Sequence, residues 1–191
     1  MSNRLLFSLL LGFLLVGGIV GAKEPATSPS PDTQAKEQNK ILKPKVYRFT
    51  DRSGQIVELL VYEKGIKLLT PKEKAAILMF YIYTGSPCRH ELQLFSKLAP
   101  NHKDLSFVTF ELKGLKPDGF PAFEKELGIK GLHMIDSAQA RPFAQFIAQI
   151  TGWTGAVPLI IALDKEGNVK HMQLGAMNEE QLKKLFAALQ A

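Results

Sequence analysis

The sequence predicts an α/β fold, a three-layer sandwich in which a central mixed sheet carries helices on both faces. Two near-continuous apolar runs, 75–83 and 105–112, are typical of strands that are buried on both faces of a sheet. Amphipathic helical segments alternate with these strands, and this order builds a partly parallel sheet. Polar turn sequences at 51–54 and 164–167 separate β-rich segments and predict an N-terminal β-hairpin and a second hairpin near the end.

The remaining elements follow from periodicity and from capping signals. Ser86-Pro87 opens a helix that Pro100 ends, and Asn178 is the expected N-cap of the last helix, whose apolar residues recur at i, i+3, i+4 and i+7. In chain order we expect strands at 46–49, 55–62, 75–83, 105–112, 132–135, 157–163 and 169–174, and helices from 86, at 120–127, at 139–151 and from 178. The short helix at 120–127 is an insert between two strands.

Two segments precede this domain. Residues 1–22 carry Arg4 and then an apolar run, which indicates either a cleaved signal peptide or an N-terminal membrane anchor. Both alternatives export the rest of the chain, and both stay open. Residues 23–44 are rich in Pro, Ser and charged residues and predict a disordered linker. Residues 45–191 form the expected domain, and a chain of this length buries about 68% of its unfolded surface.

Charge and cysteine content exclude several functions. Lys and Arg number 24 against 18 Asp and Glu, and no basic run reaches five residues, so we expect no nucleic-acid partner. The single cysteine excludes an intramolecular disulfide, a Cys-x-x-Cys redox pair and a cysteine-based zinc site within one chain. We expect neither a metal nor another cofactor.

Cys88 is the residue that points to chemistry, because it stands where a buried strand turns into a helix. A thiol in the first turn of a helix faces the positive end of the helix dipole, and Arg89 adds positive charge, so this position favours a thiolate. Glu91, about one turn later, either opposes that effect or accepts a proton. The alternative is that Cys88 is an inert, buried, small apolar residue.

The segment around Cys88 resembles the thioredoxin-like superfamily, most closely its exported TlpA/ResA/CcmG branch. That branch carries Trp-Cys-x-Pro-Cys-(Arg/Lys)-x-Glu, and here Pro87, Cys88, Arg89 and Glu91 stand at the matching positions. Val157-Pro158 resembles the turn of the superfamily that contains a cis-proline, and an Asp-Lys-x-Gly hairpin follows it. The resemblance spans about 46–189 and implies a thioredoxin-like fold.

The departures from that motif matter as much as the matches. Gly85 stands at the first, nucleophilic Cys, Thr84 at the Trp, and Met79 at the position of a buried Asp in thioredoxin. Thiol–disulfide exchange requires an attacking thiolate and then a second thiol that releases the product. One chain with one thiol therefore cannot complete a dithiol cycle alone.

The resemblance implies an exported thiol-disulfide-related protein, periplasmic or anchored in the inner membrane, whose partner is a thiol- or disulfide-bearing polypeptide. Cys88 would act as a monothiol with Glu91, and a peroxide-reactive thiol is a weaker variant of this hypothesis. The competing hypothesis is a redox-inactive, peptide-binding module. In either case the residues expected to contact substrate are Gly85, Ser86, Pro87, Val157 and Pro158.

Two further features have mainly structural interpretations. His-Met occurs at 133–134 and at 171–172, but neighbouring side chains on a strand point to opposite faces, so neither pair can chelate copper as a unit. We expect surface histidines and core methionines. Trp153, close to Pro158 in sequence, either lines the site or belongs to the core, and we favour the core.

Overall fold

The computed structural model describes residues 43–72 and 74–190. The expected signal peptide or anchor, and the linker up to residue 42, lie outside these residues and stay predictions. The first strand begins at Lys45, the residue at which the domain was expected to start. Within the described ranges, none of the helices combines the length and the apolarity needed to cross a membrane.

A mixed five-stranded sheet forms the middle layer, as predicted. Its central strands are β4, β5 and β7, and every residue of these three strands is buried. The order is β6-β5-β4-β7-β8, with β4, β5 and β6 parallel and β7 antiparallel to both β4 and β8. The bounds are β4 (Ala75–Tyr81), β5 (Leu105–Glu111), β6 (His133–Ile135), β7 (Leu159–Leu163) and β8 (Val169–Leu174).

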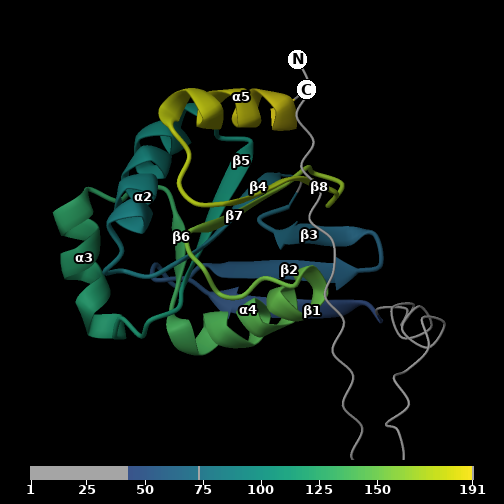
Figure 1. The fold of residues 1–191 in the computed structure, drawn as a ribbon, viewed down its shortest axis with the longest axis horizontal. Coiled ribbons are helices and arrows are strands. Elements are labelled where there is room, and N and C mark those ends of the chain that lie inside the picture. The colour runs from purple at the N-terminus through teal and green to yellow at the C-terminus, as the bar shows by residue number, and fades with distance from the viewer. Residues whose placement is uncertain (1–42, 73, 191) are drawn as a thin grey trace, which may run out of the picture. The chain divides into compact units, whose positions relative to one another are not determined.

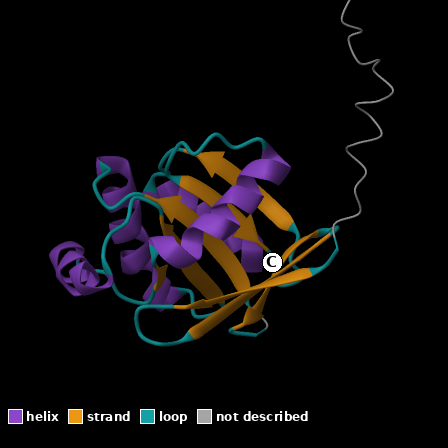
Figure 2. Cartoon of the chain, turned by 90° about the horizontal axis from the view of Figure 1, so that it is seen from below, coloured by secondary structure: helices purple, strands orange, loops and turns teal. Residues whose placement is uncertain are grey.

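Helices cover both faces of this sheet (Figures 1 and 2). One face packs against α2 (Ser86–Leu98), α3 (Phe120–Leu127) and α5 (Glu179–Gln190). The other face packs against α4 (Ser137–Thr151) and a smaller sheet. Short 3-10 turns, Ala99–Asn101 and Pro117–Gly119, follow α2 and precede α3. The predicted N-cap of the last helix is confirmed, since Asn178 Oδ1 accepts the Gln181 N–H at 2.9 Å.

The smaller sheet corrects one expectation. The predicted hairpin of β1 (Lys45–Thr50) and β2 (Ile56–Tyr62) is present, but a third strand, β3 (Gly65–Thr70), pairs antiparallel with β2. β3 was not predicted because its two-residue turn is Glu-Lys, which lacks the Asn-Gly or Asp-Gly signal. Ile66 and Leu68 of β3 alternate into the core between the two sheets.

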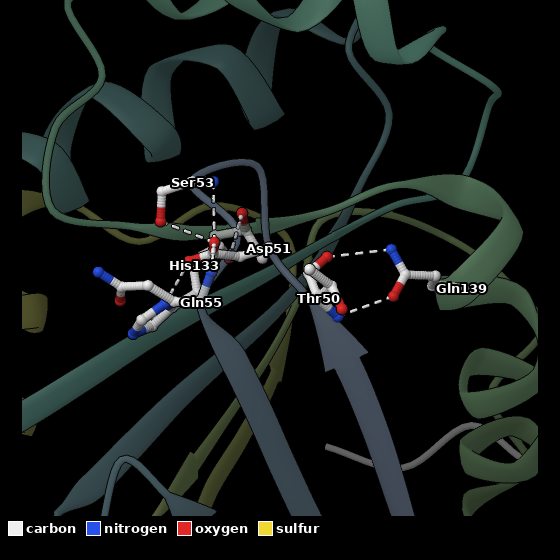
Figure 3. Close-up of polar contacts among 7 residues, drawn as sticks. Thr50, Asp51, Ser53, Gln55, His133 and Gln139 are labelled. Atoms are coloured by element: carbon white, nitrogen blue, oxygen red, sulfur yellow. Dashed lines mark hydrogen bonds and ion pairs between the residues drawn. The ribbon is translucent and has the colours of Figure 1, made fainter.

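The turn between β1 and β2 is fastened to the larger sheet through a buried carboxylate (Figure 3). Asp51 Oδ1 accepts the N–H and hydroxyl of Ser53 and the N–H of Gln55 at 2.7–2.9 Å, while Oδ2 lies 2.6 Å from His133 Nδ1 on β6. Burial raises the pKa of the Asp51 carboxyl, but hydrogen bonds from His133, Ser53 and Gln55 outweigh it, so the net shift is downward. Asp51 is therefore a buried, charged residue that links the two sheets.

A second link between the smaller sheet and the rest of the domain lies beside Asp51. The Gln139 side chain both accepts the Thr50 N–H at 2.8 Å and donates to the Thr50 carbonyl at 3.0 Å, as Figure 3 shows. The Arg52 N–H also donates to the Met134 carbonyl at 3.1 Å. The smaller sheet is thus joined to both β6 and α4.

The two His-Met pairs have different outcomes. Met134 is in the core and His133 is the partner of Asp51, but Met172 is 49% exposed, so the prediction of a core methionine is wrong there. The reason is that β8 is an edge strand whose alternate side chains are not fully covered. Within the described ranges, no group of three or more His, Cys, Asp or Glu residues could hold a metal ion.

Asp51→Ala should destabilise the domain by about 3 kcal/mol, because it leaves several buried donors without an acceptor. Urea unfolding followed by circular dichroism measures this loss. Arg48→Ala is the matched control, since it removes an exposed ion pair with Glu58 on the same small sheet and should cost less than about 1 kcal/mol. Equal effects of the two variants would contradict the role given to Asp51.

Candidate functional site

The site begins where β4 ends and α2 starts. The chain turns after Tyr81, and the Gly85 N–H donates to the Ile82 carbonyl at 3.2 Å. Gly85 is the N-cap of α2, with φ −81° and ψ 120°, and Pro87 lies in the first turn, where a missing N–H is tolerated. The predicted start of the helix at Ser86 is confirmed.

Cys88 faces the protein interior. Cys88 is 1% exposed and packs with Leu92 and Phe95 in the core on the α2 side of the sheet. Residues 88, 92 and 95 recur at i, i+4 and i+7, so they lie on one face of the helix. The residues that precede Cys88 in the turn, Ser86 and Pro87, are exposed instead.

The environment of Cys88 opposes the expected thiolate. Burial raises the pKa of the Cys88 thiol above its ordinary value, and although a backbone hydrogen bond at Ile82 lowers it, the negative charge of Glu91 raises it further. Arg89 does not counter this, because its guanidinium pairs with Glu126 of α3 and donates to the Tyr83 carbonyl at 3.4 Å. Desolvation therefore outweighs the helix dipole at this position.

Glu91 is also buried, with 0% of its surface exposed. Its Oε2 accepts the Met177 N–H at 2.9 Å, which ties α2 to the loop before α5. Its Oε1 is buried and has no hydrogen-bond partner among the described residues. Burial raises the pKa of Glu91 to about 7, and the hydrogen bond from Met177 offsets only part of that effect. Glu91 thus titrates close to neutral pH.

Two polar groups that the sequence analysis missed lie at the ends of the neighbouring strands. Burial, with the charges of Glu111, Glu124 and Cys88, raises the pKa of the Tyr81 hydroxyl well above its ordinary value. The Glu111 carboxylate accepts the N–H groups of Lys113, Gly114 and Leu115 at 2.7–2.9 Å. The signal for Glu111 was an acidic residue that ends an otherwise apolar strand and precedes a Lys-Gly turn.

The Glu111 carboxylate organises the loop that borders the site. Because three consecutive N–H groups converge on it, residues 113–115 have a fixed path. From that loop, Lys113 Nζ donates to Thr84 Oγ1 at 3.0 Å, just before the start of α2. The loops after β4 and after β5 are therefore linked at the same end of the sheet.

Val157 and Pro158 lie next to this end. The bond between them is cis, as the sequence pattern favoured, and the Pro158 carbonyl accepts the Gly175 N–H at 2.8 Å. The β4–β7 register ends with Phe80 paired to Leu159, so Val157 and Pro158 immediately precede the last paired residue of β7. Pro158 is buried and Val157 is half-buried. Across the described part of the chain, no hydrogen bond involves the Val157 backbone.

Trp153 packs on the core, as favoured from the sequence. Its ring packs on the core, with a centroid 5.2 Å from that of Phe80. Its Nε1 donates to the Ala156 carbonyl at 2.7 Å, which holds the loop that leads into Val157. One side of Trp153 also lines a surface groove between this loop and α4.

Comparison with known proteins is informative for structure alone. No family model and no curated protein matches the sequence. Among solved structures, StoA from Bacillus subtilis superimposes with a TM-score of 0.56 at 19% identity, over 75% of this chain and 97% of that chain. The chain has a thioredoxin-like fold.

Other similar structures agree with this fold. A secreted disulfide oxidoreductase from Mycobacterium tuberculosis matches with a TM-score of 0.55 at 17% identity, over 75% of this chain and 96% of its own. A thioredoxin-family thiol:disulfide interchange protein from Chlorobium tepidum gives 0.58 at 17%, over 78% and 99%. These similar structures include proteins described as thiol:disulfide interchange proteins and a disulfide oxidoreductase.

Gly85→Cys should restore a disulfide-forming pair. A Cβ built at Gly85 lies 3.4 Å from Cys88 Sγ, and the backbone of Gly85 has a φ that any residue adopts, although Ile82 must shift by a few tenths of an ångström. Mild oxidation of the folded variant should therefore consume both thiols and lower its mass by about 2 Da. Thr84→Cys is the control, because Thr84 points to Lys113. Two free thiols in oxidised Gly85→Cys would contradict this geometry.

Glu91→Gln should remove a pH dependence of stability. The pKa of Glu91 is higher in the folded than in the unfolded chain, so folding stability falls as pH rises from about 4.5 to about 7 and is level above. At about 1.4 kcal/mol per pKa unit, wild type should lose about 2 kcal/mol relative to Glu91→Gln between pH 5 and pH 8. Urea unfolding of both proteins at four pH values measures the difference, and parallel curves would refute it.

Proposed function

We propose that this protein is an exported, thioredoxin-fold binding protein that holds an extended polypeptide segment without using its own thiol for redox chemistry. The binding site is the loop surface, defined as Thr84, Ser86, Pro87, Ala156 and Val157. All five residues are exposed or half-exposed, and they lie at the end of the sheet where β4 and β7 meet the loops.

The observation that carries this proposal is that the Val157 backbone makes no hydrogen bond to any described residue, while the Cys88 thiol is buried. An extended segment that pairs with Val157 would add a short strand-like contact, because the N–H and C=O groups of Val157 offer one donor and one acceptor. The Cys88 thiol is covered, burial raises its pKa above the ordinary value, and Gly85 supplies no second sulfur. These observations support binding over exchange.

The fold and the predicted export support the cellular setting. One protein of similar structure is described as secreted, and others as thiol:disulfide interchange proteins. The apolar segment at 1–22 predicts export of this chain as well. The proposed ligand is therefore a polypeptide of the cell envelope, in the periplasm or at the inner membrane, with or without cysteines.

Thiol exchange through Cys88 is the second candidate, and the free oxygen of Glu91 favours it. A buried carboxylate that titrates near pH 7 is suited to accept the proton of a neighbouring thiol. The thiolate would attack a partner disulfide, form a mixed disulfide and release one partner sulfur as a thiolate. This step requires the start of α2 to open, since Cys88 is 1% exposed.

Cys88→Ala should bind an unfolded polypeptide that has no free thiol and no disulfide as tightly as wild type does, within a factor of two. Carboxymethylated α-lactalbumin is a suitable probe, and calorimetry on the full-length chain measures its Kd. Ser86→Arg should weaken binding at least tenfold by crowding the loop surface. Asn101→Arg, an exposed change in the turn after α2, is the control for added charge.

Alkylation of the native thiol separates the two candidates. Under the binding proposal, N-ethylmaleimide should label Cys88 in the folded chain at least a hundredfold more slowly than in urea. Labelling at the rate of a free thiol, together with loss of binding in Cys88→Ala, would refute the binding proposal and favour exchange through Cys88.

A further inference from the structure

We propose that the bound segment inserts an apolar side chain, flanked by acidic residues, into a groove beside Trp153. This inference rests on the proposed function and names the sequence class of its ligand. The Trp153 groove has a volume of about 330 Å³ and is lined by Leu112, Arg141, Ala144, Gln145, Ala148, Trp153, Thr154 and Gly155.

One wall of the Trp153 groove is a stripe of α4. Arg141, Ala144, Gln145 and Ala148 recur at i, i+3, i+4 and i+7, so they lie on the same helical face. Ala144 lies in the middle of this stripe and Ala148 at its C-terminal end, and the small side chains of these two alanines leave the space that a larger side chain would fill. A groove of this volume is at the lower end for small-molecule sites and suits one large apolar side chain.

The opposite wall is the loop that leads to Val157. The Trp153 indole N–H is already bonded to the Ala156 carbonyl, so the ring offers apolar surface rather than a free donor. That same bond fixes the loop two residues before Pro158. Because the wall ends at Gly155 and Val157 is two residues further, a segment paired with Val157 would run past the mouth of the groove. Alternate side chains of an extended segment lie on one face, and one of them would enter.

The charges at the rim select the neighbouring residues of the ligand. No residue that lines the groove is acidic, and Arg141 is exposed without a hydrogen bond or an ion pair to any described residue. The Arg141 guanidinium lies 3.8 Å from the Cβ position of Gly114, at the edge of the loop that follows β5. Carboxylates beside the apolar residue of the bound segment complement this unpaired cation.

The single tryptophan of the chain makes the groove directly observable, because Trp153 is the only source of indole fluorescence. The probe is a blocked pentapeptide, acetyl-Gly-Glu-Leu-Glu-Gly-amide, titrated into the full-length protein. We expect a saturable change in Trp153 emission. The Kd should rise at least tenfold when both glutamates become lysines, and at least tenfold when the leucine becomes glycine.

Variants of α4 test the apolar contact and the charge contact separately. Ala148→Leu fills the groove and should weaken peptide binding at least tenfold, whereas Gln149→Leu, an exposed change on the next residue of α4, should leave binding within a factor of two. Arg141→Gln should reduce the preference for glutamate over lysine to less than threefold and retain the requirement for leucine.

Negative results in these experiments distinguish the groove inference from the proposed function. If carboxymethylated α-lactalbumin binds and Ser86→Arg weakens it, but the pentapeptide leaves Trp153 unchanged or Ala148→Leu has no effect, the groove inference is wrong and the proposed function stands. Equal or tighter binding of the lysine peptide overturns the choice of acidic ligands. If neither the polypeptide nor the pentapeptide binds, both proposals are wrong.

Discussion

Burial of β4 on both faces is the constraint on which the rest of the fold depends. Its alternate residues supply both cores, with Ala76, Leu78 and Phe80 on the α4 side and Ile77, Met79 and Tyr81 on the α2 side. β5 pairs with one edge of β4 and β7 pairs with the other. The chain that follows β4 can therefore leave the sheet only beyond the last residue of this strand. The turn at 82–85 therefore lies where the loops after β5 and before β7 also emerge, and this convergence builds the loop surface.

The burial of the central strands also explains which helices and strands could be predicted from the sequence. Continuous apolar runs predicted β4 and β5, and the helix at 120–127 and the strand at 169–174 were predicted to the residue. Strand ends were less predictable: 82–83 and 157–158 adjoin apolar strand sequence but lie beyond the paired residues of β4 and β7. Pairing, which is a tertiary property, sets those ends. The strand β3 was missed because its turn carries no local signal.

The spacing of apolar residues along α2 already indicates that Cys88 is buried, although the helix dipole favours a thiolate there. Leu92 and Phe95 marked the buried stripe of α2, and the spacing back to Cys88 puts the thiol on that stripe. The same spacing, from Phe95 and Leu98, puts Glu91 there. A helix dipole favours a thiolate only where solvent or partner charges remain, and burial costs more than the dipole contributes. The pairing of Arg89 with Glu126 depends on α3 and could not be read from the motif.

Redox chemistry and polypeptide binding are physically separable in this fold. The contacts that shape the loop surface are backbone hydrogen bonds to Glu111, the Trp153–Ala156 bond and the Gly175–Pro158 bond, and none of them involves sulfur. With Gly85 before α2 the chain lacks the attacking group of a dithiol cycle, but these contacts do not depend on that group. The proposed binding at the loop surface therefore requires no sulfur, and the Cys88 thiol is part of the core.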